Sequence, residues 1–171
     1  VGKDNVAIGL QTLSNDATGS RNTAVGTTAL KNSQATGSTF NLRYNTALGY
    51  AAGLNVSVAE QNTLIGAFAG DTLTSGSNNT IVGYNADTSA NNGSQQIVMG
   101  RSVESVGNNT FTFGKDDGSD RVHNTFTSNA TFTRVSDERY KKEIQTNTDC
   151  GLDFINDLRT VTFKFRAKSE I

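Results

Sequence analysis

The chain has 171 residues and a formal net charge of −1, with 35% hydrophobic residues, 17 glycines and no proline or tryptophan. The near-zero net charge argues against a polybasic surface for nucleic acid or an anionic membrane. No run approaches the roughly 18 apolar residues of a membrane span. One cysteine, Cys150, and one histidine, His123, are too few for an internal disulfide or a His/Cys zinc site within one chain.

A repeat of 17 residues occupies the first part of the chain. The pattern Asn-Thr-apolar-apolar-Gly occurs as NTAVG, NTALG, NTLIG and NTIVG, with variants NVAIG before them and QIVMG and TFTFG after them. The asparagines that recur in this pattern are Asn5, Asn22, Asn45, Asn62 and Asn79. The recurring glycines are Gly9, Gly26, Gly49, Gly66, Gly83 and Gly100. Successive glycines are 17 residues apart except for one interval of 23, which we interpret as an insertion around 34–45. This periodicity predicts stacked β-roll or β-helix rungs.

Each copy has two adjacent apolar positions. The first is occupied by Ala7, Ala24, Ala47, Leu64, Ile81 and Val98, and the second by Ile8, Val25, Leu48, Ile65, Val82 and Met99. Because neighbouring side chains of a strand point to opposite faces, we expect a strand that is buried on both sides. One face would line the core of the chain's own coil. The other would pack against a partner, and identical neighbouring chains around a fibre axis are the simplest candidate.

The remaining repeat positions also have structural interpretations. Glycine after the strand permits a positive φ or a close backbone approach. Small residues three positions later, Ala29, Ala52, Ala69 and Ala86, predict a second strand that faces the same core. The recurring asparagines predict a ladder of side-chain amides that bond from rung to rung. A less favoured alternative is an ice- or glycan-binding face formed by the row Thr23, Thr46, Thr63 and Thr80.

Composition changes after the repeats, and three regions follow from it. Residues 1–107 form the predicted β-roll or β-helix shaft, and residues 108–135 a β-hairpin connector. In the connector, Thr110–Phe113 and Thr125–Thr127 alternate as strands do, and Gly114–Asp120 has turn residues. Residues 136–171 predict part of a small α/β unit, with a short helical pattern followed by the strand Val161–Phe165. The predicted fold class is an all-β repeat fibre that ends in this partial α/β segment.

The last segment resembles a known family. The motif SDERYKKEI at 136–144, the run GLDFINDLR at 151–159 and the strand after it resemble the opening motif, helix and strand of the endosialidase-type intramolecular chaperone domain. That domain lies at the C-terminal end of many phage tail fibres and tailspikes. The family usually has leucine where Tyr140 stands and proline where Thr160 stands. The upstream repeat resembles the β-roll heads of trimeric autotransporter adhesins and the repetitive shafts of viral fibres.

The resemblance implies a homotrimer and a chaperone segment that brings three chains into register. It also implies self-cleavage of the Ser136–Asp137 bond, with Ser136 as the nucleophile and Lys141 as its general base. A serine hydroxyl needs a base to become a good nucleophile, and burial in an assembled trimer favours the uncharged lysine that can act as one. This is at most single-turnover autoproteolysis by a Ser-Lys dyad, not a turnover enzyme. Ser136 is equally suited to cap a helix, with Asp137 and Glu138 in its first turn.

The resulting functional hypothesis is a structural segment of a phage tail fibre or spike that attaches to the host surface. Its expected partners are two further copies in a homotrimer, a host cell-surface receptor with a glycan among the candidates, and other virion tail or fibre proteins. We expect no nucleic acid, membrane insertion, cofactor or metal. The expected location is the virion, outside the cell. Two alternatives stay open: the stalk of a bacterial trimeric adhesin on the cell surface, and a protein that is primarily a self-cleaving serine protease.

Overall fold

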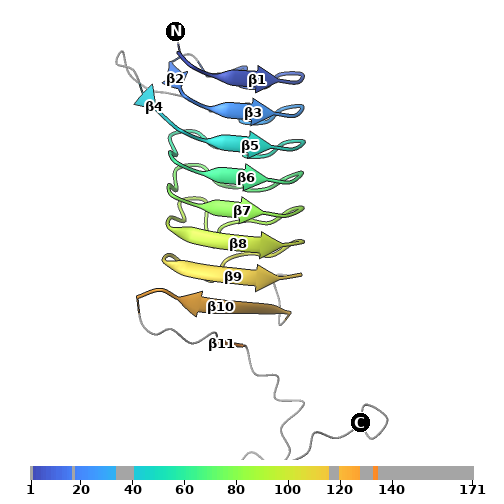
Figure 1. Ribbon diagram of the computed structural model, residues 1–171, viewed down its shortest axis with the longest axis vertical. Helices are drawn as coiled ribbons and strands as arrows, with labels where there is room; N and C mark the ends of the chain where they lie inside the picture. The colour runs from blue at the N-terminus through green and yellow to red at the C-terminus, as the bar shows by residue number, and fades with distance from the viewer. Residues whose placement is uncertain (1, 17, 34–40, 116–119, 128–132, 135–171) are drawn as a thin grey trace, which may run out of the picture. The chain divides into compact units, whose positions relative to one another are not determined.

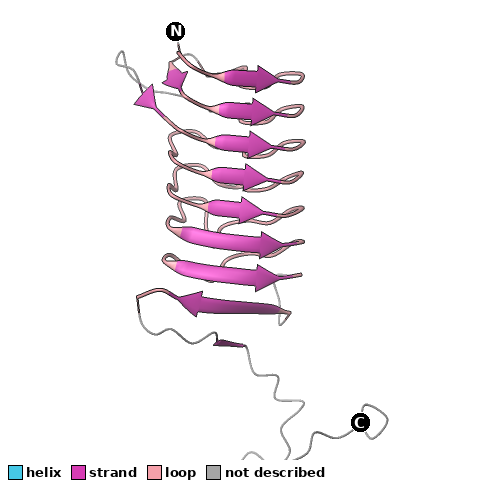
Figure 2. Ribbon diagram, in the orientation of Figure 1, coloured by secondary structure: helices cyan, strands magenta, loops and turns pink. Residues whose placement is uncertain are grey.

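The computed structural model describes residues 2–16, 18–33, 41–115, 120–127 and 133–134. The chain divides into two compact units, Val1–Ser136 and Asp137–Ile171, and every described residue belongs to the first. The described part contains strands and no helix (Figure 2). The helix and strand that we predicted within 136–171 lie outside the described residues.

A single nine-stranded sheet organises this unit (Figure 1). In order across the sheet, the strands are β1 (Val6–Ile8), β3 (Thr23–Val25), β5 (Thr46–Leu48), β6 (Thr63–Ile65), β7 (Thr80–Val82), β8 (Gln96–Gly100), β9 (Thr110–Gly114), β10 (Arg121–Thr125) and β11 (Thr133–Arg134). Two short strands, β2 (Gly19–Ser20) and β4 (Asn41–Leu42), form a separate parallel pair. β4 lies within the predicted insertion around 34–45, and no motif in the sequence predicted this pair.

The strands from β1 to β9 are parallel and stack in register. Equivalent residues of neighbouring repeats are direct partners: Ala47 pairs with Leu64, and Leu64 pairs with Ile81. Each 17-residue repeat is therefore one turn of a coil, and each turn adds one strand to the sheet. The prediction of stacked all-β rungs is confirmed as a β-solenoid.

The core is a thin column inside the coil. The first apolar position of the rungs is fully buried at Ala24, Ala47, Leu64, Ile81 and Val98. The small residues after each glycine, Ala29, Ala52, Ala69 and Ala86, are also 0% exposed. They belong to the core as expected, but they do not lie on a second strand. The residue before each, such as Thr28 or Phe68, has a positive φ of 58° or 59°, which turns the chain there.

Glycines stack on one another at the end of each strand. From Gly26 to Gly83 their φ angles lie between 129° and 148°, in a region that side chains disfavour. A Cβ atom on Gly66 would also collide with the carbonyl of Gly83 in the next rung, and the same contact recurs along the column. Both expected reasons for glycine therefore apply, and they let the chain leave the strand without separating the rungs.

The sheet continues beyond the last clear repeat. β9 pairs with β8 in parallel from Gln96 and Thr110 to Gly100 and Gly114, so TFTFG forms a further rung. β10 then returns antiparallel to β9, which confirms the predicted hairpin. The second strand is Arg121–Thr125 rather than the predicted Thr125–Thr127, because the pairing of Arg121 with Gly114 sets an earlier register.

Candidate assembly surface and chaperone segment

The second apolar position of each rung points away from the core. We call these side chains the outer apolar row, and they are Ile8, Val25, Leu48, Ile65, Val82, Met99 and Phe113. Parallel register places them next to one another, as in the pairing of Leu48 with Ile65 and of Ile65 with Val82. Leu48 is 48% exposed and Met99 43% exposed, whereas their inner neighbours Ala47 and Val98 are fully buried.

The row forms a continuous apolar surface on a parallel sheet. Scattered apolar residues are common on protein surfaces, but a contiguous patch usually marks an interface. Parallel sheets are, moreover, almost always covered on both faces. The chain's own coil covers the inner face, which agrees with one half of the predicted two-sided burial. The outer face is the part of the described structure best suited to receive a partner.

A threonine row lies on the same face, beside the outer apolar row. Thr46 and Thr63 are half-buried, and Thr23 and Thr80 are exposed. Each threonine is two residues before the outer apolar side chain of its strand, so the two rows point the same way. A partner that covers the apolar row would therefore cover the threonines as well.

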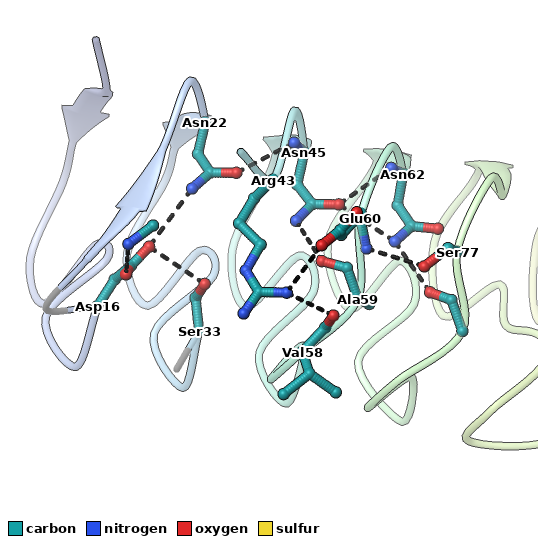
Figure 3. A network of polar contacts seen from close by, with 12 residues as sticks. Asp16, Asn22, Ser33, Arg43, Asn45, Val58, Ala59, Glu60, Asn62 and Ser77 are labelled. Carbon is teal, nitrogen blue, oxygen red and sulfur yellow. Dashed lines mark hydrogen bonds and ion pairs between the residues drawn. The ribbon is translucent and has the colours of Figure 1, made fainter. Parts of the chain in front are cut away.

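The recurring asparagines form a ladder just before the strands, at the end opposite the glycine column (Figure 3). The Oδ1 atom of each accepts the backbone N–H of the next, at 3.0 Å from Asn45 to Asn22, 3.0 Å from Asn62 to Asn45 and 2.9 Å from Asn79 to Asn62. The Nδ2 atoms of Asn45, Asn62 and Asn79 donate to backbone carbonyls, such as that of Ala59 at 2.9 Å from Asn45, whereas the Nδ2 atom of Asn22 donates to the Asp16 carboxylate. Asn22, Asn45 and Asn62 are 0% exposed.

This ladder has a structural role. It provides hydrogen-bond partners for backbone groups that the tight turns bury, and buried polar groups without partners are costly. Both ends of each amide are occupied: Asn62, for example, also donates to the carbonyl of Gly76 at 3.0 Å. Asn5, at the end of the array, is exposed and still bonds to Asn22 and Gly19. The side chains of Asn22, Asn45, Asn62 and Asn79 are buried, so a ligand in solution cannot reach them.

A buried arginine beside the ladder was missed in the sequence. Arg43 lies near the end of the predicted insertion and is 4% exposed. Its guanidinium donates to the carbonyl of Val58 at 2.6 Å and lies 3.3 Å from the carboxylate of Glu60 (Figure 3). The equivalent residue of a later rung is Ser77, whose hydroxyl accepts the Glu60 N–H. Only the alignment of rungs across the insertion could have shown that Arg43 replaces a serine.

Three aromatic side chains that are scattered in the sequence meet at the corner after the strands. Phe68 lies edge-to-face between Tyr50 and Tyr84, with ring centroids 5.2 Å and 6.0 Å away. Tyr50 and Tyr84 each directly follow a glycine of the column, and Phe68 comes one position later in the rung between them. Aligning the repeats therefore brings the three aromatics to one corner, although they lie far apart in the sequence.

The predicted catalytic residues Ser136, Asp137 and Lys141 lie outside the described residues. Among those that the structure describes, no group of three or more His, Cys, Asp or Glu side chains could hold a metal ion. The described residues also contain no helix that is long and apolar enough to cross a membrane. The described residues instead present an exposed apolar row and a buried asparagine ladder.

Comparison with known proteins agrees with the resemblance found in the last segment. Residues 136–170 match the family model described as chaperone of endosialidase. No curated protein and no solved structure matches the chain. The chain therefore combines a β-solenoid with a segment that is similar to the chaperone of endosialidase.

Proposed function

We propose that this chain is a structural segment of a viral tail fibre or spike, which assembles as a homotrimer and presents an adhesive structure to the host surface. The observation that carries the proposal is the outer apolar row. It extends over seven stacked rungs, and the chain continues from them into a segment similar to an intramolecular chaperone.

Simple energetics support assembly through the outer face. A half-exposed aliphatic side chain that becomes buried contributes about 1 kcal/mol. Association costs roughly 4–15 kcal/mol in lost freedom of motion. One rung cannot offset that cost, but seven rungs in each of three chains can. Three chains around one axis would each turn the same face inward, which suits a repeat that presents one row on every rung.

Such an interface creates a need for a chaperone. Successive rungs are nearly identical, so two chains can pair one rung out of register at little cost. A segment after the shaft that gathers three chains first would set the register before the rungs associate. Self-cleavage between Ser136 and Asp137, if assembly completes the Ser-Lys dyad, would release that segment once its role is over.

The location of the fibre decides between our proposal and its main alternative, the stalk of a bacterial surface adhesin. Antibodies against the chain can be applied to purified virions and to cell envelopes, with gold labelling in the electron microscope. We expect label on virion tails. Label on envelopes of uninfected cells, with none on virions, would contradict the viral proposal and favour the adhesin.

Self-cleavage has its own test, the denatured intact mass of the natural full-length chain beside its Ser136→Ala variant. We expect the wild type to be split before Asp137 and the variant to stay whole. A variant that is split like the wild type would remove Ser136 from the nucleophile role. A wild type that stays whole would make Ser136 a structural residue, with the segment a permanent part of the fibre.

A further inference from the structure

The outer face changes character along the array. In the middle rungs it alternates a threonine with an aliphatic residue, as in Thr63 and Ile65 of β6. In the last two parallel strands both outward positions are apolar. β8 presents Ile97 and Met99, and β9 presents Phe111 and Phe113. At the opposite end, β1 also presents two apolar residues, Val6 and Ile8, but only at β8 and β9 does this extend over two neighbouring strands and include aromatic side chains.

These residues also shape the surface. A shallow, largely open hollow of about 500 Å³ is lined by Met99, Phe111 and Phe113 together with two glycines of the column, Gly100 and Gly114. The two glycines stack closely there, and a Cβ on Gly100 would collide with the carbonyl of Gly114. The rings of Phe111 and Phe113 lie beside it, 5.3 Å apart between centroids. The hollow opens on the outer face, where an apolar side chain can enter.

We propose that Ile97, Met99, Phe111 and Phe113 form an interchain clamp, which packs against the same four residues of a second copy of this chain. An apolar side chain of that copy fills the hollow above the two glycines. The proposal rests on the homotrimer of the proposed function and adds where its chains hold together most strongly. We call these four residues the clamp.

Three observations favour a second copy as the occupant. The clamp contains the last two residues of the outer apolar row, Met99 and Phe113, and β7, β8 and β9 pair in register. Its four side chains are uncharged, and Phe113 and Met99 are 38% and 43% exposed in the single chain. Aromatic residues dominate the energetics of interfaces because each buries a large apolar area.

The clamp also explains how near-identical rungs could find their register. If two chains slip by one rung relative to each other, the middle of the shaft still places threonine beside threonine and an aliphatic residue beside an aliphatic residue. The same slip at the clamp places Phe111 and Phe113 of one copy beside Ile97 and Met99 of another and leaves the hollow unfilled. Correct register is therefore favoured at this end far more than in the middle of the shaft.

A matched pair of double variants tests the clamp in the full chain. Phe111→Thr with Phe113→Val gives β9 the outer residues of β7, which are Thr80 and Val82. The control, Val6→Thr with Ile8→Val, makes the same rung at β1, the opposite end of the sheet. Sedimentation velocity over a dilution series measures dissociation of the trimer, and circular dichroism checks that each variant keeps its β-structure.

We expect the β9 variant to raise the concentration for half-dissociation at least about a hundredfold, tenfold for each phenylalanine lost. The β1 control should change it less than about threefold. A trimer that resists both variants, or is weakened equally by both, would overturn the clamp and leave the trimer standing. A wild type that does not associate would overturn the trimer and the clamp together.

A third variant protects the test against misfolding. Phe113→Leu keeps an apolar side chain beside the hollow, and we expect it to retain most of the association that the β9 double variant loses. Equal loss in Phe113→Leu and in the double variant, with β-structure intact in both, would contradict packing as the cause.

Discussion

The middle rungs, β5 to β8, and the terminal hairpin of β9 and β10 belong to the same sheet but place different side chains on its inner face. The middle rungs place Leu64, Ile81 and Val98 on the inner face, where they are fully buried. The hairpin places Thr112 and His123 there, directly opposite each other. Within the described residues, the Thr112 hydroxyl and His123 Nδ1 are buried without a hydrogen-bond partner.

The difference shows what a repeat supplies and what its end must replace. A middle rung finds its partners in identical neighbours on both sides, so one five-residue motif satisfies the backbone, the asparagines and the core. The last rung has no identical neighbour beyond it. The chain turns back in the hairpin instead, and the inner side chains become polar where the apolar column ends.

The largest loss of stability in the middle rungs is expected from Gly66→Ala. The new methyl meets the carbonyl of Gly83, and alanine must also adopt a φ of 129°. We expect a loss of about 3–5 kcal/mol in the free energy of unfolding, measured by urea denaturation. Gly107→Ala is the control, because its φ is also positive but nothing lies near the added methyl. Equal losses in the two variants would contradict close stacking of the glycine column.

A smaller loss of stability is expected from Asn62→Ala in the asparagine ladder. The change leaves the Asn79 N–H and the Gly76 carbonyl buried without this partner. We expect a loss of about 3 kcal/mol in the free energy of unfolding. Asn55→Ala removes an exposed asparagine that donates to the Asp71 carbonyl, and it should cost under about 1 kcal/mol. Similar melting temperatures for both variants would show that the ladder adds little.

In the hairpin, removal of a buried polar group is expected to increase the free energy of unfolding, not to lower it. Thr112→Val replaces a buried hydroxyl that lacks a partner, and we expect a gain of about 1 kcal/mol in the free energy of unfolding. Thr110→Val should cost about 1 kcal/mol, because the Thr110 hydroxyl donates to the Gly107 carbonyl at 2.6 Å. Destabilisation by both changes would show that the hydroxyl of Thr112 is satisfied in the folded chain.

The smallest expected effect concerns a carboxyl pair in the middle rungs. Burial raises the pKa of Asp71 above its ordinary value of 3.8, and the nearby Asp87 carboxylate raises it further. The folded chain thus binds this proton more tightly than the unfolded chain, so the stabilisation is full below pH 3.8 and is lost as the pH rises through the raised pKa. Asp71→Asn should raise the melting temperature slightly at pH 7 and not below pH 3.8. A pH-independent difference would contradict this account.

The motif predicted the rungs because each of its positions has one physical role. Leu64 fills the core, Ile65 faces outward, Gly66 makes the close turn and Asn62 bonds to the next rung. The turn before Ala69 could not be predicted in the same way. Positive φ at Thr28 or Phe68 leaves no mark in the residue type, since these residues rarely adopt it.

The candidate surfaces were predictable to different degrees. Two adjacent apolar positions were enough to predict the outer apolar row, because strand geometry sends them to opposite faces. The contacts among Tyr50, Phe68 and Tyr84 depend on offsets within three separate rungs, and the hollow at the clamp depends on two glycines aligned by sheet register. Such features need the register first, and only the structure supplied it.

The most direct test of the account is the solution mass of the full chain, measured by light scattering as it elutes from a sizing column. If the outer apolar row joins three copies, the mass is three times that of the chain and holds over a tenfold dilution. A single chain mass at every concentration, with the β-structure intact, would contradict assembly through the outer face.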